Sequence, residues 1–260
     1  MGTMHRWCSW SVCLLLLPAL AAAQSAGPAG RIESGTFRLY KFAQAIGQET
    51  YEIRAGGDGV VLTDAFLFTD RGTRVPLNTT FRAAADLTPR SFSLKGRSSR
   101  LSTIDEAVDI SDQRARIRQT NATREIGAPR RFFTISGYSP VAQQMLLMRY
   151  WLTHGSPSSL PILPRGTDVR IRARGTKQVS LGGRPVRLKR YSVTGLIWGQ
   201  ETLWLDAREN LVALVRHSDA VFGTVLELSG RQALLPVAGI LGLRDQLDAL
   251  VHAIDELRVH

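Results

Sequence analysis

Few residues in the sequence have the types and spacing that covalent chemistry requires. After residue 23, no two histidines lie within four positions of each other, so no His-x-His pair is available for a metal ion. The Gly-x-Ser-x-Gly turn, a glycine-rich phosphate loop and the His-Glu-x-x-His motif are all absent. We therefore expect no catalytic residue, no metal ligand and no cofactor. Enzymatic activity stays an open question, but the sequence favours a non-catalytic role.

Carboxylates gather in one short segment, Ile104–Asp112, which contains Asp105, Asp109 and Asp112. Calcium prefers oxygen ligands of this kind. The segment lacks the spacing and the glycine of a calcium loop, and alternation of exposed acids along a strand accounts for it.

Aromatic side chains form the most suggestive pattern. In a filled β-sandwich they would be core residues, whereas in a curved half-barrel they could line a cavity for an apolar ligand. Both interpretations stay open at this stage. The candidate ligand-binding residues are Phe66, Phe68, Phe92, Trp151, Trp198 and Trp204.

The chain is strongly basic, with 33 Lys and Arg against 22 Asp and Glu. One interpretation is a cationic face for an anionic membrane surface, with Arg170, Arg172 and Arg174 as candidate anion-binding residues. The other is arginine-rich codon usage combined with solubility. No nucleic-acid-binding motif is present, so we expect no nucleic-acid partner.

The N-terminus resembles a secretory signal, residues 1–23. A basic start and an apolar run lead to Ala21–Ala23, where we expect cleavage after Ala23. An uncleaved anchor would need about 20 apolar residues, and Trp10–Ala23 supplies 14, interrupted by Ser11 and Pro18. Both cysteines of the chain fall within this signal. We expect an exported protein, periplasmic or extracellular, without disulfides.

Apolar and polar residues alternate along much of the remaining chain. Residues 60–68 place Val60, Leu62, Phe66 and Phe68 on one face, with Asp64 as the exception. Turn residues separate such segments, as in Gly56–Gly59. The pattern predicts a mainly β fold: one large curved, half-barrel-like antiparallel sheet of ten to twelve strands.

Two segments have helical periodicity instead. One runs over residues 139–154, with Ser139 as the expected N-cap, and a C-terminal helix is expected over 231–259. A proline-rich loop, 156–164, follows the first helix. We expect a flexible leader at 24–34 and then a single β-rich domain at 35–260, rather than two domains divided near Pro164.

Five segments resemble the leading domain of exported acidobacterial amidohydrolases. They are Gly35–Phe42, Phe68–Thr73, Asp86–Phe92, Met148–Trp151 with His154–Gly155, and Trp198–Asp206. This resemblance implies that the metal ligands of the family belong to a later barrel domain, which starts with a His-x-His pair. The sequence has no such pair, so the activity does not carry over. A stand-alone relative or a truncated product of such a gene is expected.

At fold level, the chain also resembles periplasmic half-barrels related to lipoprotein carriers. This resemblance implies an acyl chain on the concave face beneath a helix. Three functions follow as hypotheses. The first is a non-catalytic exported binding or accessory module, with a lipid, another amphipathic ligand or a partner hydrolase. The second is the N-terminal part of an amidohydrolase. The third is a cationic envelope-binding protein.

Overall fold

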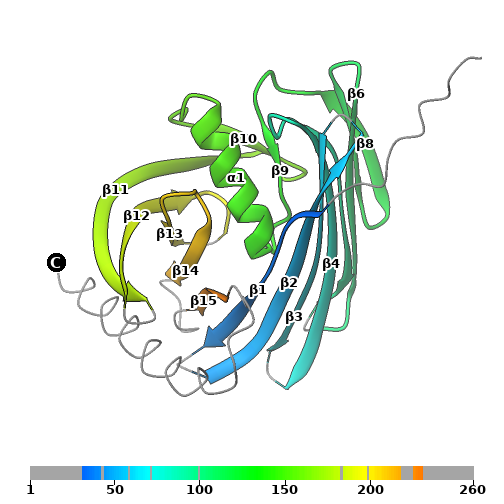
Figure 1. Cartoon of the computed structure of the whole chain (residues 1–260). Helices are drawn as coiled ribbons and strands as arrows, with labels where there is room; N and C mark the ends of the chain where they lie inside the picture. Colours follow the sequence, from blue (N-terminus) through cyan, green and yellow to red (C-terminus); the bar gives the residue numbers. More distant parts are fainter. Residues whose placement is uncertain are drawn as a thin grey trace, which may run out of the picture.

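The computed structural model describes residues 31–41, 44–57, 59–70, 72–98, 100–181, 184–197, 199–217 and 225–230. These residues form one large, predominantly antiparallel sheet and one helix, α1 (Val141–Thr153) (Figure 1). The predicted mainly β, half-barrel fold is confirmed. The expected signal peptide and the expected helix over 231–259 lie outside the described residues. Strand β1 begins at Arg31, so the last four positions of the expected leader are in the sheet.

Fifteen strands are described, where ten to twelve were expected. The extra strands include two short ones that are difficult to recognise by periodicity, and one of these, β10, lies within the expected proline-rich loop. The strands are β1 (Arg31–Lys41), β2 (Gln44–Gly56), β3 (Gly59–Asp70), β4 (Thr73–Ala84), β5 (Pro89–Arg97), β6 (Thr103–Ser111), β7 (Arg114–Gln119), β8 (Ala122–Gly127), β9 (Phe133–Thr134), β10 (Leu160–Leu163), β11 (Thr167–Leu181), β12 (Arg184–Thr194), β13 (Gln200–Leu205), β14 (Leu211–His217) and β15 (Val225–Gly230).

The sheet consists of two meanders joined at one seam. Its strand order is β8-β7-β6-β5-β4-β3-β2-β1-β15-β14-β13-β12-β11-β10-β9. Neighbouring strands are antiparallel, except that β9 and β10 run parallel. The seam is the pairing of β1 with β15, from Thr36 opposite Gly230 to Lys41 opposite Val225. Most strands therefore pair with strands adjacent to them in the chain, as expected for a meander.

The turn between β6 and β7 contains two consecutive residues with positive φ angles. Between β6 and β7, Asp112 and Gln113 have φ angles of 48° and 60°. Two consecutive positive φ angles suit the right-handed twist of the strands that they connect. Asp112, predicted to lie on an exposed strand, is instead the first residue of this turn.

Helix α1 crosses the concave side of the sheet, between its two halves (Figure 1). Ten of its residues are buried, including Gln143 and Gln144, so the helix is enclosed on nearly every side. A single hydrophobic core joins it to inward-facing residues of both meanders, such as Phe81 of β4, Ile171 of β11 and Leu203 of β13. In the described part of the chain, α1 and the side chains packed against it therefore form the core on the concave side.

The start of α1 differs from the sequence expectation. Pro140, not Ser139, is the N-cap, and no side chain at the cap position accepts a hydrogen bond. Instead, the carboxylate of Glu49 on β2 accepts hydrogen bonds from the backbone N–H of Val141 and of Ala142, each at 2.7 Å. Glu49 is completely buried. A negative charge at this end also complements the helix dipole.

The end of α1 follows the expected pattern. Gly155 has a φ of 82°, a left-handed conformation that glycine adopts without steric cost. The backbone N–H of His154 donates to the carbonyl of Tyr150, and that of Ser156 donates to the carbonyl of Trp151. These bonds satisfy carbonyl groups that the last turn would leave open.

We predict that Glu49→Ala destabilises the protein by about 2 kcal/mol or more, because two buried helix N–H groups lose a charged acceptor. Urea unfolding followed by tryptophan fluorescence measures this difference. Glu52→Ala is the matched control, since Glu52 lies on the same strand and forms a half-exposed ion pair with Arg54 at 2.9 Å. Such pairs contribute about 0–1 kcal/mol. Equal losses in the two variants would contradict the anchoring role of Glu49.

Candidate functional site

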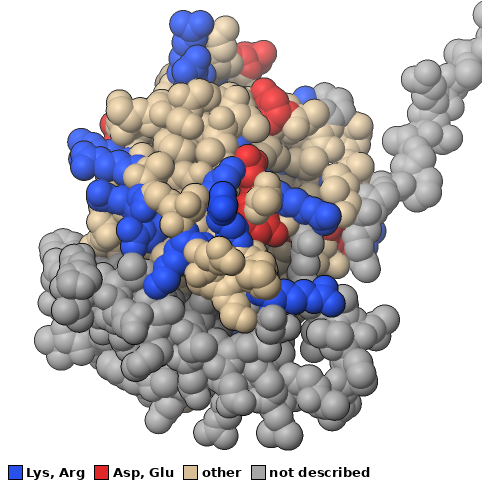
Figure 2. Space-filling model, turned by 60° about the vertical axis from the view of Figure 1, so that its left-hand side comes forward, with Lys and Arg blue, Asp and Glu red and all other residues tan. Residues whose placement is uncertain are grey.

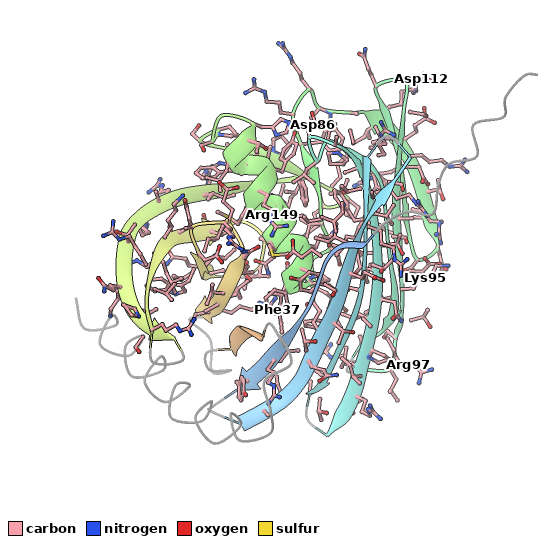
Figure 3. The ribbon with its side chains drawn as sticks, in the orientation of Figure 1. Phe37, Asp86, Lys95, Arg97, Asp112 and Arg149 are labelled. Carbon is pink, nitrogen blue, oxygen red and sulfur yellow. The ribbon has the colours of Figure 1, made fainter. Side chains whose placement is uncertain are left out.

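Arg149 on α1 connects the helix to both halves of the sheet. It donates from Nη1 to Oε2 of Glu33 and from Nη2 to Oδ1 of Asn210, each at 2.9 Å. The Tyr51 hydroxyl donates to the other oxygen of Glu33 at 2.8 Å. Figure 3 shows Arg149 extending from α1 on the inner side of the sheet. Arg149 thereby joins α1 to β1 and to the β13–β14 loop, and Tyr51 holds the Glu33 carboxylate in place. This cluster therefore positions the helix.

A second polar cluster lies at the start of α1. Oε1 of the fully buried Glu201 on β13 accepts hydrogen bonds from Nε of Arg216 at 3.0 Å and Nε2 of Gln144 at 3.2 Å. Burial raises the pKa of the Glu201 carboxyl, while the positive charge of Arg216 opposes the rise. Both Gln144 and Arg216 also donate to the carbonyl of Ser139. The cluster therefore fixes the residues that lead into the helix.

Asp64 on β3 is the exception on its apolar face, as the sequence indicates, and its side chain is buried. It stands directly opposite Tyr51 on β2 and Thr79 on β4. Neither carboxylate oxygen has a hydrogen-bond partner in the described part of the chain. Burial raises the pKa of this carboxyl from 3.8 to about 7. A buried acid without partners costs free energy when it is ionised.

The candidate aromatic residues do not form one site. The core contains Phe66, Phe92 and Trp151, and Phe68 packs against it. Trp204 belongs to a separate buried cluster with Leu188 and Ala213. Trp198 lies outside the described residues. Ligand binding by these side chains stays a prediction, and the positions that are described are engaged in packing.

The candidate arginines form a row on the outer face of β11, opposite to α1. Arg170, Arg172 and Arg174 are exposed, while the alternating Val169 and Ile171 are buried in the core. Their cross-strand neighbours on β12 are uncharged: Arg170 stands opposite Thr194 and Arg172 opposite Ser192. Figure 2, which brings this side of the molecule forward, shows Lys and Arg side chains at several places on the described surface, with some acidic side chains among them.

The basic surface continues from β11 onto β12. Residues 170–190 contain eight Lys and Arg and no Asp or Glu. The Arg174 Nε donates to the Ser192 hydroxyl at 2.8 Å. The Arg190 guanidinium lies over the Trp204 ring, 5.5 Å from its centroid, and donates to the carbonyl of Arg174. We call the outward-facing residues Arg170, Arg172, Arg174 and Arg190 the arginine face.

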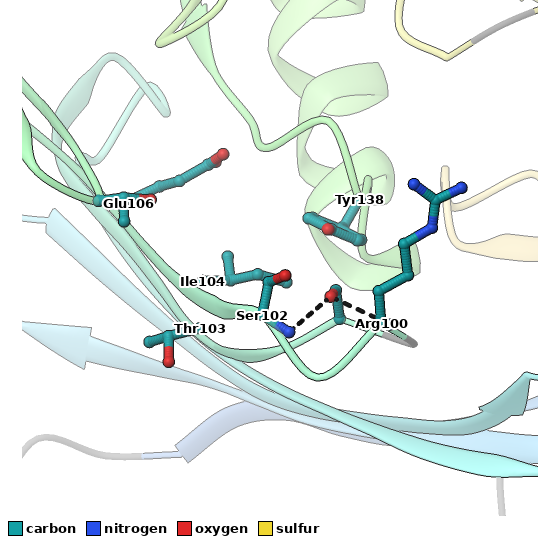
Figure 4. A pocket seen from close by; sticks show the side chains of 8 residues that line it. Arg100, Ser102, Thr103, Ile104, Glu106 and Tyr138 are labelled. Atoms are coloured by element: carbon teal, nitrogen blue, oxygen red, sulfur yellow. Dashed lines mark hydrogen bonds between the residues drawn. The ribbon is translucent and has the colours of Figure 1, made fainter.

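A polar pocket of about 430 Å³ opens where three connections meet (Figure 4). They are the β5–β6 loop, the β7–β8 turn and the segment that precedes α1. Burial raises the pKa of Glu106, while hydrogen bonding by Ser136 and the charge of Arg165 oppose the rise. Burial, and then the Glu106 charge, raise the pKa of Tyr138. The pocket is lined by Ser98, Arg100, Ser102, Thr103, Ile104, Glu106, Thr120 and Tyr138.

Sequence reasoning missed the acids on the inner face of the sheet. Glu49 shares the parity of Tyr51 and Ile53 along β2, and Glu106 shares that of Ile104 along β6. An acid at an inward position of an alternating strand is the signal that could have found them. The same signal was noticed at Asp64.

No group of three or more His, Cys, Asp and Glu side chains in the described ranges could hold a metal ion. Within them, no helix has the length and apolar character needed to cross a membrane.

Comparison with known proteins supports the fold. The chain is similar to a solved structure from Brucella abortus described as a beta-barrel-like protein of the domain of unknown function DUF1849. The TM-score is 0.50, with 10% identity over 76% of this chain and 94% of that chain. No protein-family model and no curated protein matches the sequence.

At this low identity, the similarity concerns the fold alone. The predicted half-barrel resemblance is thereby confirmed in its broader form, as a β-barrel-like architecture. The comparisons give no support to the resemblance to amidohydrolases, and a partner hydrolase stays a prediction.

We predict that Asp64→Asn stabilises the protein at pH 8 but much less at pH 4. The folded-state pKa lies above the unfolded value, so the folded protein binds more protons between pH 4 and 7, and stability falls as pH rises through that window. A rise of this size corresponds to about 4 kcal/mol at most. Urea unfolding at both pH values measures the difference. The exposed Asp109→Asn is the control, and a stabilisation by Asp64→Asn that does not change with pH would refute the assignment.

Proposed function

We propose that the protein is a non-catalytic, exported binding module that attaches to an anionic lipid surface through the arginine face. The observation that carries this proposal is a row of exposed arginines on β11 with no acidic residue opposite Arg170 or Arg172 on β12. In the described part of the chain, no acidic side chain forms an ion pair with Arg170 or Arg172, and Asp168, at the start of the strand, accepts a hydrogen bond from Ser159.

A second arginine row in the same sheet provides the contrast. Arg114, Arg116 and Arg118 alternate along β7 as the others do along β11. Here acids stand beside them: Arg114 pairs with Glu125, Arg118 pairs with Asp105 at 2.5 Å, and Arg116 stands opposite both Asp109 and Glu125. The β7 row is therefore neutralised within the sheet, whereas the β11 row is not.

Electrostatics favours an external anion at the β11 row. Alternate residues on a strand lie about 6.6 Å apart, so three guanidinium groups repel one another across a short distance. Phosphate headgroups relieve this repulsion, because guanidinium groups bind phosphate oxygens with paired hydrogen bonds. Each Arg near an anionic membrane contributes about 1 kcal/mol of attraction.

The core that packs against α1 on the concave side is a further reason to place binding on the outer face. An acyl chain held under α1 would have to displace side chains that already pack in the core, including Phe66, Phe92 and Trp151. Closely packed cores resist such insertion. The amphipathic-ligand version of the proposal is thus less well supported than attachment at the surface.

We predict that the purified protein sediments with phosphatidylcholine vesicles that contain 30% phosphatidylglycerol, and not with pure phosphatidylcholine vesicles. Raising NaCl from 50 to 300 mM weakens binding strongly, because salt screens exposed charges. The triple variant R170Q/R172Q/R174Q loses about a hundredfold in affinity, from three contributions of about 1 kcal/mol.

The triple variant R114Q/R116Q/R118Q is the matched control, since it removes the same net charge at the same spacing. It should lose less than tenfold, and circular dichroism establishes that both variants fold. Equal losses would mean that only net charge matters. Binding that is insensitive to salt, or binding to neutral vesicles, would also contradict the proposal.

A further inference from the structure

The polar pocket lies apart from the arginine face and has a different chemistry. None of the four arginines of that face lines it. Its volume of about 430 Å³ is near the lower end of the range for small-molecule sites. It therefore suits a ligand of one or two small rings rather than a lipid chain.

Glu106, which lines the pocket and whose carboxyl also interacts with Ser136 and Arg165, has one oxygen with an unused capacity for hydrogen bonding. Glu106 on β6 projects inward, and its Oε2 is buried without a hydrogen-bond partner in the described residues. An ionised carboxylate only accepts hydrogen bonds, so the missing partner must be a donor. An O–H or N–H group of a ligand would satisfy this oxygen and recover the free energy lost on burial.

The other polar groups of the pocket also need hydrogen-bonding partners on a ligand. Hydroxyls of Ser102, Thr103 and Thr120 can donate or accept, and Arg100 only donates. The Ser98 hydroxyl oxygen accepts from the backbone N–H of Ser102 at 3.1 Å, which holds the loop in place. A ligand that is complementary to these side chains carries several hydroxyls that both donate and accept hydrogen bonds, as a sugar does.

Apolar surface at the rim supplies the remaining constraint. Tyr138, which lines the pocket, is 36% exposed, and Leu101, in the β5–β6 loop between the lining residues Arg100 and Ser102, is 64% exposed. Leu101 has a φ of 62° and Thr120 has a φ of 48°, left-handed conformations that cost non-glycine residues free energy and recur near functional sites. The Tyr138 ring offers a flat surface on which the C–H face of a sugar ring can pack.

We propose that this pocket binds the pyranose ring of a sugar, with Glu106 as hydrogen-bond acceptor, Arg100 and the hydroxyls as polar contacts, and Tyr138 as the packing surface. This inference goes beyond the proposed attachment to lipid and does not depend on it. The protein then carries two sites: a positively charged outer face and a small polar pocket at the ends of β5–β8.

The test is titration of the isotope-labelled protein with N-acetylglucosamine and, separately, with glucose, followed by amide chemical shifts. We expect saturable shifts of Ser102, Thr103 and Thr120 for at least one of the two sugars. Glu106→Gln weakens binding about tenfold, because a neutral amide replaces the charged acceptor. Asp109→Asn is the control on the same strand and opposite face, and it leaves the affinity unchanged.

Tyr138→Ala is the second variant, since a partly exposed side chain can be removed without disturbing the core. It also weakens binding several-fold. The triple variant R170Q/R172Q/R174Q keeps sugar binding, which separates this proposal from attachment to lipid. The proposal is overturned if neither sugar shifts these amides at 50 mM, if ethanolamine binds there in place of sugar, or if Glu106→Gln and Tyr138→Ala both leave the affinity unchanged.

Discussion

The bond between the Glu49 carboxylate and the first turn of α1 is the contact on which the rest of the structure depends. A fully buried charge is costly unless it is paired, and here the pairing groups are two backbone N–H groups of a helix. The contact fixes α1 against β2, and Arg149 fixes its other side to β1 and to the β13–β14 loop. With the helix held in this position, the aromatic residues of both meanders have a partner to pack against.

Local patterns predicted most of the fold. Alternation at Val169–Arg174 or Ala115–Arg118 arises from neighbours along the strand, so the sequence reveals it directly. The expected helix at 139–154 matches the observed α1 to within two residues at its start and one at its end. The N-cap prediction was wrong, because the acceptor at the helix start comes from Glu49, which is 92 positions from Val141. No local pattern contains a partner at that distance.

For the candidate sites, too, the sequence predicts patterns along one strand but not contacts between residues far apart in the chain. The arginine rows of β7 and β11 are alike in sequence, and only strand register reveals that acids neutralise the first. Likewise, the pocket is assembled from three connections, and no single connection has a binding motif. Glu49 and Asp64 both interrupt apolar faces of their strands, but Glu49 accepts hydrogen bonds from the start of α1, whereas neither carboxylate oxygen of Asp64 has a hydrogen-bond partner in the described residues.

The seam between β1 and β15 has a consequence for the order in which the molecule assembles. Thr36 and Gly230 are paired there although almost the whole domain separates them in the chain. During vectorial synthesis, the β1–β8 meander emerges first, and the edge of β1 stays without its partner until β15 is made. An open edge of this length is a template for pairing with another chain. The growing chain is therefore exposed to aggregation at this edge for as long as the residues between β1 and β15 take to be made, and the exposure ends when β15 pairs with β1.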